Sequence, residues 1–475
     1  MSTIYEEFLE LVAIDGKERQ KTLPEWKEAC RRIGLTEEDV RFSTREWIPE
    51  HMEVHYVGVR KILGALIRES IDHTKLPEYK AMGKKIVYGV MPAQVPTYMA
   101  LKKAGGDDIF VSFPDLNMMW TGQYLFNKSS KYFELAEQNG MTYGARHCAL
   151  NKMRVGIRLS GLVPTPDVDW AWGLVCDEAT KIDEYINCMY DEDWKTVITR
   201  LPHDTCRHEK GWDDPDRVKF LGQELRHSMA EVEKIIGIKV QDEHVNQALE
   251  DFQQLLIKGS TLTGMTFAAD PQPLCSTTLL VATGLYQACP FNTGLNYLLD
   301  GLNTLIDEVH KDIKNGIGIY PQGAPKVGFY FVPWALPWID KMFRDNGIAT
   351  SVSASFTVAK RQLEPPKYTD PYEMSAESWL KMVFALGCQP EIDDWIEKVS
   401  LYKPDAFISG FLDYDRWIGA LHKKMAKELE IATGVPSFYI EADFYDGRDY
   451  SAEALRTRIE SICQIVKTKK LVNSK

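Results

Sequence analysis

The strongest constraint on the fold is a recurring order of short apolar runs, each followed by a loop and a longer helical segment. The first such unit opens with a β-branched run at residues 84–90, passes Pro92 and Pro96, and enters a helix that Gly105 and Gly106 close. Further strand candidates lie at 108–113, 153–159, 168–175 and 196–201. Strands that alternate with helices form a parallel sheet covered by helices. The pattern therefore predicts a first α/β domain over residues 85–209.

A second series of the same kind follows a long helical stretch. Residues 210–320 show helical periodicity with charged faces, which predicts a helical connector. Strand candidates then return at 325–332, 348–352, 405–409 and 437–440, separated by helices that include 417–433 and a final one from Ser451. Residues 1–84 are charged and helical in pattern, without strand-like alternation.

The predicted fold class is therefore α/β, with two Rossmann-like parallel-sheet domains. The predicted boundaries are an N-terminal helical region at 1–84, the first α/β domain at 85–209, the helical connector at 210–320 and the second α/β domain at 321–475. A chain of 475 residues with 44% apolar content is long enough to bury more than one core.

Charge and cysteine usage narrow the class of protein. The formal net charge of −12 argues against nucleic acid or an anionic membrane surface as the main partner, because both favour clustered Lys and Arg. The N-terminal residues lack a basic region before an apolar core, and no apolar run approaches 18 residues. Nine scattered cysteines do not resemble a disulfide framework. We expect a cytoplasmic enzyme with reduced thiols and no nucleic-acid or membrane partner.

Two cysteines, Cys148 and Cys176, lie close to strand candidates of the first domain. Chemistry in α/β folds gathers at strand ends, and neither cysteine belongs to a CxxC zinc pattern. They are candidates for a cluster or nucleophile site formed across space, or else small buried hydrophobes. His147 beside Cys148, and Glu178 close after Cys176, are candidate proton donors.

The C-terminal run Gly434-Val435-Pro436-Ser437-Phe438-Tyr439-Ile440-Glu441-Ala442-Asp443-Phe444-Tyr445-Asp446-Gly447-Arg448 resembles the closing segment of the benzoyl-CoA reductase and 2-hydroxyacyl-CoA dehydratase family. The order of parts is similar too: Cys148, Cys176, a helical middle, then Cys388 before the strand at 405–409. The resemblance covers roughly residues 85–465. It implies a [4Fe-4S] cluster between the domains, a homologous second subunit, an ATP-hydrolysing activator that delivers single electrons, and an acyl-CoA substrate.

The resemblance breaks where the family supplies a third cluster cysteine. Here that stretch is Gly410-Phe411-Leu412-Asp413-Tyr414-Asp415-Arg416, so that Asp415, or less favourably Asp413, takes the cysteine's place. A carboxylate is a harder and weaker partner than thiolate for a sulfide-bridged cluster. Three hypotheses stay open: ligation by Cys148, Cys176 and Asp415; rescue by another thiol such as Cys388; or a subunit that has lost its cluster. Asp415 also suits the start of the helix that follows.

The resemblance implies a radical acyl-CoA enzyme of the oxidoreductase or lyase class. Residues 386–388 and the long N-terminal region are more similar to the larger benzoyl-CoA reductase subunit, which favours reduction of an aromatic acyl-CoA. The alternatives are a 2-hydroxyacyl-CoA dehydratase subunit and a non-catalytic partner that lacks its own cluster. Tryptophans that could line an aromatic pocket, or simply fill the core, are Trp120, Trp170, Trp172, Trp334 and Trp338.

Overall fold

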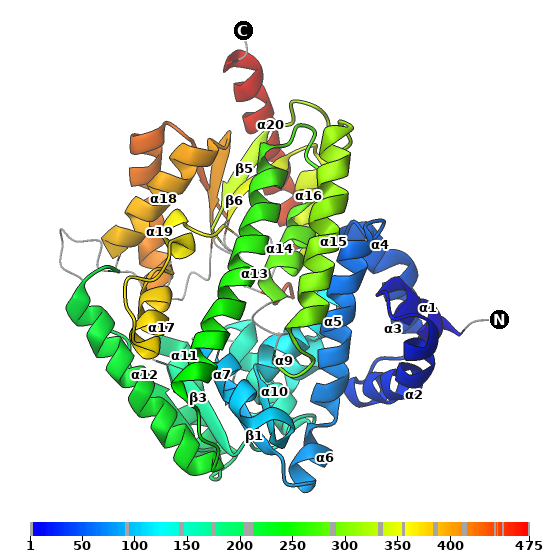
Figure 1. Cartoon of the computed structure of the whole chain (residues 1–475). Helices are drawn as coiled ribbons and strands as arrows, with labels where there is room; N and C mark the ends of the chain where they lie inside the picture. Colours follow the sequence, from blue (N-terminus) through cyan, green and yellow to red (C-terminus); the bar gives the residue numbers. More distant parts are fainter. Residues whose placement is uncertain are drawn as a thin grey trace.

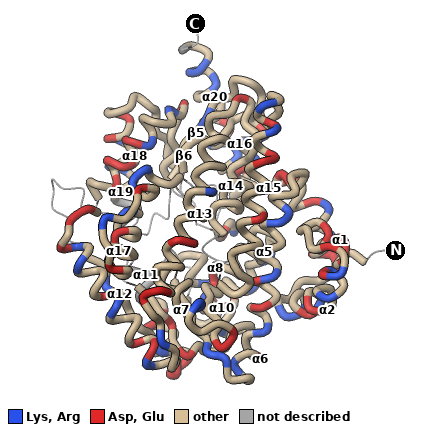
Figure 2. Tube along the Cα trace, viewed as in Figure 1, with Lys and Arg blue, Asp and Glu red and all other residues tan. Residues whose placement is uncertain are grey.

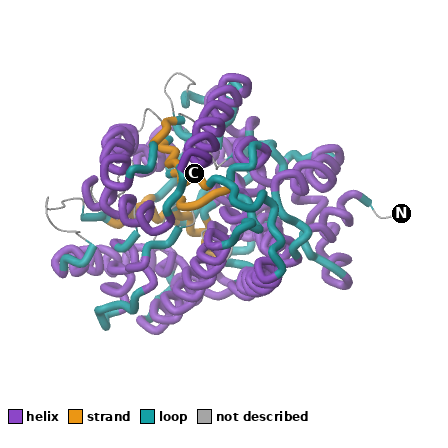
Figure 3. The backbone as a smooth tube through the Cα atoms, turned by 90° about the horizontal axis from the view of Figure 1, so that it is seen from above, coloured by secondary structure: helices purple, strands orange, loops and turns teal. Residues whose placement is uncertain are grey.

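A computed structural model describes residues 3–90, 95–141, 147–172, 177–202, 212–285, 291–330, 336–353, 357–382, 388–410, 416–440, 443, 445–448 and 451–473. Within these ranges the chain forms two parallel sheets, which lie at the two ends of a layer of long helices (Figure 1). Seen from above, the strands run through the middle of the molecule and helices surround them (Figure 3). The predicted α/β class with two parallel sheets is confirmed.

The two sheets share one topology. The first contains β1 (Lys85–Gly89), β2 (Ile109–Ser112), β3 (Val168–Trp172) and β4 (Thr196–Thr199) in the order β2-β1-β3-β4. The second contains β5 (Lys326–Phe329), β6 (Ala349–Ser353), β7 (Ala406–Ser409) and β8 (Ser437–Tyr439) in the order β6-β5-β7-β8. All pairs are parallel, so the carboxyl ends of each sheet's strands meet at one edge. In each sheet the strand order reverses beside the first strand, where α/β folds bind their ligands.

The N-terminal region is helical, as predicted. Its elements are α1 (Ile4–Leu11), α2 (Gly16–Ile33), α3 (Glu37–Phe42), the π-helix η1 (Ser43–Trp47), α4 (Ile48–His51), α5 (Val57–Thr74) and α6 (Leu76–Ala81). Helix α5 packs along α15 (Leu295–Lys314). Glycine is required at this contact, because a Cβ at Gly58 would lie 2.3 Å from the Leu305 nitrogen. The region is therefore joined closely to the connector.

The connector is helical as well. It consists of α12 (Pro215–Ile236), α13 (Asp242–Ala268), α14 (Ser276–Gly284) and α15. The helices that connect and follow the strands of the first sheet are α7 (Val95–Gly105), the 3-10 helix η2 (Gly106–Asp108), α8 (Pro114–Met118), the π-helix η3 (Met119–Leu125), α9 (Ser130–Gln138), α10 (Ala149–Leu159) and α11 (Asp177–Met189). Those of the second sheet are α16 (Pro337–Asp345), the 3-10 helix η6 (Lys360–Leu363), α17 (Pro371–Leu380), α18 (Cys388–Tyr402), α19 (Arg416–Thr433) and α20 (Ala452–Asn473). The domain boundaries at 84, 209 and 320 remain a proposal.

One predicted strand is wrong: residues 153–159 form the second half of α10. Met153, Val155 and Ile157 alternate with other residues as they would in a strand, and all three are buried. The helix is buried on nearly every side, however, because Arg154 and Lys152 are also buried. The polar residues Asn151, Arg154 and Arg158 do recur at helical spacing, but the alternation of apolar residues within so short a run also fits a strand, and a short run is ambiguous between the two.

Lys and Arg positions and Asp and Glu positions are both spread along the outer helices (Figure 2). Among the described residues, no helix combines the length and the apolar character that crossing a membrane requires.

Candidate functional site

Cys148 lies at the start of α10, where it is the N-cap residue. Its carbonyl accepts the Lys152 N–H at 3.1 Å, and its side chain is half-buried against the main core. Because α10 leads back to the amino end of β3, its first turn lies at the carboxyl edge of the first sheet. Arg154, further along α10, donates to the carbonyl of Gly89 at the end of β1, which agrees with this placement. His147 immediately precedes Cys148 and is also half-buried.

The other predicted site residues are described in part or not at all. Cys176 and Asp415 lie outside the described residues, and Glu178 belongs to α11 without a described side chain. Strand β3 ends at Trp172 and α11 begins at Asp177, so Cys176 belongs to the segment that joins them. Helix α19 begins at Arg416, directly after Asp415. Across the ranges that the structure describes, no group of three or more His, Cys, Asp or Glu side chains could hold a metal ion.

The sequence reasoning missed a buried ionic cluster beneath this edge. Arg154 is 1% exposed, and its guanidinium contacts three buried aspartates. Its Nη2 donates to Asp169 on β3, its Nε lies 2.9 Å from the Asp183 Oδ1 on α11, and its Nη1 lies 3.6 Å from the Asp115 Oδ2 on α8. One residue in the sequence could have indicated this cluster: Asp169 is an acid in the otherwise apolar run Val168-Asp169-Trp170-Ala171-Trp172, and a buried acid needs a partner.

The electrostatics of this cluster follow from its burial. Burial raises the pKa of Asp169 well above its usual range, and the nearby Asp183 adds to the effect, although Arg154 opposes it. Burial likewise raises the pKa of Asp115. Burial alone would lower the pKa of Arg154, but the carboxylates of Asp169 and Asp183 outweigh it and raise that pKa. The cluster therefore keeps a charged guanidinium among three carboxyl groups, and burial favours the protonated form of Asp169.

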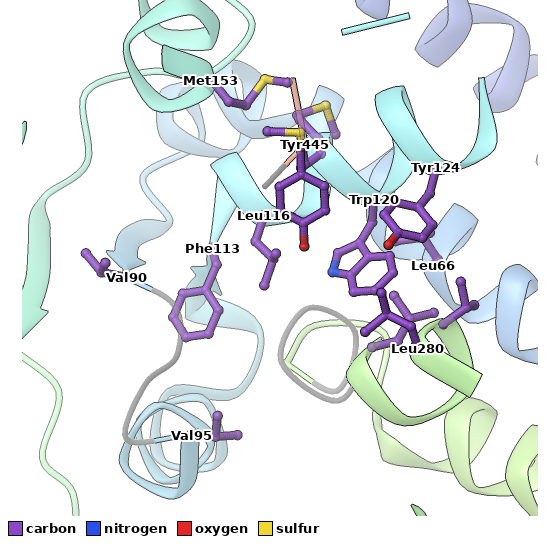
Figure 4. Close-up of a cluster of buried hydrophobic side chains, with 14 of the residues drawn as sticks. Leu66, Val90, Val95, Phe113, Leu116, Trp120, Tyr124, Met153, Leu280 and Tyr445 are labelled. Atoms are coloured by element: carbon purple, nitrogen blue, oxygen red, sulfur yellow. The ribbon is translucent and has the colours of Figure 1, made fainter. Parts of the chain in front are cut away.

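An apolar wall lies beside the same edge (Figure 4). Phe113, Trp120 and Tyr124 extend from the segment after β2, and Trp120 and Tyr124 pack with ring centroids 4.6 Å apart. Tyr445 comes from the C-terminal segment, and its hydroxyl points between Leu116 and Trp120 (Figure 4). Every one of these side chains is buried. The wall therefore combines residues of the first sheet with residues that lie more than 300 positions further along the chain.

The tryptophans on β3 belong to the core. Trp170 and Trp172 are at most 1% exposed. The Trp170 Nε1 donates to the Thr199 hydroxyl at 2.9 Å, and the Trp172 Nε1 donates to the Val90 carbonyl at 2.7 Å. Their polar atoms are thus used within the fold, which supports the core interpretation for this pair. Trp334 lies outside the described residues.

The carboxyl edge of the second sheet holds another buried polar group. Tyr330 follows β5, and its hydroxyl donates to Glu391 in the first turn of α18. The His422 ring, from α19, packs edge-on against Tyr330 with centroids 4.4 Å apart. Burial raises the pKa of Glu391 to about 8 and lowers the pKa of His422 to about 3. Cys388 is the first residue of α18 and is half-buried, so a cysteine lies at the start of α18 and another, Cys148, caps α10.

The C-terminal segment is joined to the first sheet by ion pairs. Arg448 lies 2.6 Å from Asp446 and 2.8 Å from Glu137 on α9. Lys152 on α10, also buried, lies 2.9 Å from Glu137. A cavity of about 350 Å³ opens beside this network, and Trp338 of α16 is among its lining residues. The segment that carries the family-like sequence therefore reaches the helix that Cys148 caps.

The structure thus defines an α/β protein with two parallel sheets, a thiol at one carboxyl edge and buried titratable groups beneath both edges. Residues 108–465 match the family model described as 2-hydroxyglutaryl-CoA dehydratase, D-component. The match covers most of the chain, which therefore belongs to this family, and the resemblance found in the sequence is confirmed. No curated protein matches the chain.

Membership of this family indicates the class of function. The family comprises subunits of radical enzymes of the 2-hydroxyacyl-CoA dehydratase and benzoyl-CoA reductase type. Its members typically bind an iron–sulfur cluster and form heteromeric enzymes served by an activator.

Proposed function

We propose that this chain is a subunit of an ATP-dependent, iron–sulfur, radical acyl-CoA enzyme that reduces an aromatic acyl-CoA thioester, as benzoyl-CoA reductase does. The observation that carries the proposal is the position of Cys148, a half-buried thiol at the carboxyl edge of the first sheet in a chain of this family. The reductase is favoured by the N-terminal helical region, because the family match begins only at residue 108.

The described part of the site suits a [4Fe-4S] cluster, because a thiolate is its usual ligand and Cys148 is not sealed in the core. Cys148, Cys176 and Asp415 would hold it, and when bound it would supply single electrons at low potential to the thioester. His147 and Glu178 are proposed as proton donors. The buried apolar wall of Phe113, Trp120, Tyr124 and Tyr445 would keep water away from this edge.

The proposed partners are a homologous second subunit, an ATP-hydrolysing activator and the acyl-CoA substrate, and the proposed location is the cytoplasm. Two other functions have a specific observation in their favour. A 2-hydroxyacyl-CoA dehydratase subunit is favoured by the description of the matching family. A non-catalytic partner is favoured by residues 410–416, which contain no cysteine.

Iron analysis tests the cofactor. The chain is purified without oxygen, alone and with its co-purifying partner, and iron, acid-labile sulfide and the EPR spectrum after reduction are measured. About four irons per chain, as one [4Fe-4S] cluster requires, support a cluster-bearing subunit. Iron in the complex but none in the isolated chain supports the non-catalytic partner, and no iron in either sample rules out the proposed function.

A substrate assay separates the two reactions. The complex receives the activator, ATP and a low-potential reductant, and either benzoyl-CoA or a 2-hydroxyacyl-CoA is added. Consumption of benzoyl-CoA alone supports the reductase. Consumption of the 2-hydroxyacyl-CoA alone supports the dehydratase, and consumption of neither contradicts both.

A further inference from the structure

We propose that the Trp120 indole N–H and the Tyr445 hydroxyl form a pair of hydrogen-bond donors for the thioester carbonyl of the acyl-CoA substrate. The inference rests on the proposed function for the class of substrate. It deepens that function by assigning two catalytic residues that come from widely separated parts of the chain.

The Trp120 N–H is a buried donor that the fold itself does not use. The side chain is 3% exposed, and within the described part of the chain its Nε1 has no hydrogen-bond partner. The indoles of Trp170 and Trp172, by contrast, donate to groups of the fold. A buried donor without a partner is costly, so in native proteins it ordinarily has one, and that partner can be a bound ligand.

This donor lies where the carboxyl edges of the two sheets face each other. Trp172, at the end of β3, packs against Trp379 of α17, which follows β6, with ring centroids 5.0 Å apart. Tyr445 follows β8 and packs against Tyr124 of η3 with ring centroids 6.0 Å apart. Ligands of α/β proteins bind outside the carboxyl edges of their sheets. A group bound by Trp120 and Tyr445 would therefore contact both halves of the chain.

The two polar atoms are directed toward one place (Figure 4). The Tyr445 hydroxyl points between Leu116 and Trp120, and in the same view the Trp120 nitrogen lies at the edge of its ring toward this hydroxyl. Asp446, the next residue after Tyr445, lies 3.6 Å from Lys152 on α10, the helix that Cys148 caps. The donor pair is therefore placed beside the helix that carries the proposed cluster ligand.

Both donors are fixed before a ligand binds. Trp120 packs against Tyr124 with ring centroids 4.6 Å apart, and a Cβ at Gly284 of α14 would lie 3.2 Å from the Trp120 Cζ2 atom. Burial raises the pKa of the Tyr445 hydroxyl, and the nearby Asp115 adds to the effect, so this group is protonated at neutral pH and can donate. Donors that are fixed in advance need no reorganisation when charge develops on a substrate.

Two donors suit the chemistry of the carbonyl oxygen. One electron, supplied by the activator, converts the C=O group of the thioester into a ketyl radical anion. No bond breaks and no proton moves in this step, so the added charge lies largely on the oxygen. Hydrogen bonds to that oxygen strengthen as the charge develops. The pair should therefore affect turnover more than substrate binding.

The test compares ligands with and without the carbonyl oxygen. The chain, purified without oxygen together with its partner subunit, receives benzoyl-CoA or a 2-hydroxyacyl-CoA, and each is compared with the CoA thioether in which a methylene group replaces the carbonyl. Calorimetry without the activator gives the affinities in the absence of turnover. We expect Trp120→Phe and Tyr445→Phe each to weaken binding of the tighter thioester about fivefold, as the loss of one hydrogen bond predicts, and to leave binding of its thioether unchanged. With activator and ATP, kcat should fall by about a hundredfold.

Trp26→Phe is the matched control. Trp26 is a buried indole of α2 whose Nε1 also has no hydrogen-bond partner among the described residues, and it packs against Phe8 in the N-terminal region with ring centroids 4.8 Å apart. Its replacement removes the same atoms from a core away from the sheet edges, so the affinities and kcat should stay at their wild-type values. Thermal unfolding shows which of the variants are folded.

A loss of affinity that is equal for thioester and thioether, or no loss in either variant, overturns the inference and indicates a packing role or a buried water. If Trp120→Phe fails to fold, infrared spectra of the isotope-labelled thioester carbonyl are measured with the wild type and with Tyr445→Phe. A stretch that moves to lower frequency on binding, and moves back in Tyr445→Phe, supports the donor pair. A stretch that does not shift on binding to the wild type overturns the inference, whichever variants fold.

Binding without turnover separates this inference from the proposed function. If the complex consumes a thioester but neither its affinity nor its kcat depends on Trp120, the inference fails and the function stands. If no thioester is consumed while carbonyl-dependent affinity still requires Trp120, the proposed reaction fails and the carbonyl site stands. A wild type that binds neither thioester removes both.

Discussion

Glu391 provides the most quantitative prediction, because it is a buried acid with few partners. It is 1% exposed, it accepts a hydrogen bond from the Tyr330 hydroxyl, and burial raises its pKa from an ordinary 4.5 to about 8. Between these two pH values the folded chain holds a proton that the unfolded chain has lost. The contribution of Glu391 to stability is therefore most favourable below pH 4.5, declines as the pH rises from 4.5, and is lost as the pH passes about 8.

Glu391→Gln removes this decline. At pH 7 the penalty covers about 2.5 pH units at about 1.4 kcal/mol each, or roughly 3 kcal/mol. Glutamine keeps an oxygen that accepts the Tyr330 hydrogen bond and has nearly the shape of the protonated acid. We therefore expect the variant to raise the free energy of unfolding by roughly 3 kcal/mol at pH 7 and by much less than 1 kcal/mol at pH 4.

Urea unfolding, followed by tryptophan fluorescence at several pH values between 4 and 8.5, measures the difference between variant and wild type. Glu397→Gln is the control, because Glu397 is exposed on the same helix and its replacement should change stability by less than about 0.5 kcal/mol. A gain that is equal at pH 4 and pH 7, or no gain at pH 7, would refute the reasoning.

Three further predictions concern packing and the proposed ligands. Gly156→Ala on α10 should lower the free energy of unfolding by roughly 1–3 kcal/mol, because the added Cβ would lie 2.1 Å from a carbonyl oxygen of α9. Gly264→Ala on α13, where no atom lies within 4 Å of the added Cβ, should raise the free energy of unfolding by roughly 0.5–1 kcal/mol. Thermal unfolding of the two variants and the wild type measures both changes. Cys148→Ser should abolish iron binding while Cys188→Ser, at an exposed thiol, should not, as iron analysis would show. Asp415→Cys should keep or increase the bound iron and sharpen its EPR spectrum if Asp415 occupies a ligand position, whereas an unchanged spectrum would favour the helix-capping alternative.

The sequence predicted most strands of both sheets, because each is a β-branched or aromatic run bounded by turn residues. The run at 168–175 and the one at 405–409 correspond to β3 and β7 within a few residues. The run at 153–159 was assigned wrongly, because Met153, Val155 and Ile157 alternate as in a strand although the polar residues of α10 recur at helical spacing. A window of seven residues was too short to separate the two periods.

The site was predictable only in part. Cys148 was singled out by its neighbours in the sequence, and the structure places it at the carboxyl edge of the first sheet as the cap of a helix. Arg154 was not singled out, because a basic residue in an apolar run is ordinarily placed on a surface. Its partner Asp183 lies 29 positions away, and no local pattern relates two such residues.

The sequence by itself determined the order of strands and helices, the helical N-terminal and connector regions, and the family, because these follow from local periodicity, turn residues and a contiguous run of similar residues. Tertiary structure alone decided which buried charges meet. Arg154, Asp169 and Asp183 come together because the parallel crossover stacks α10 and α11 against β3, and a buried charge is tolerated only where such packing supplies its partner.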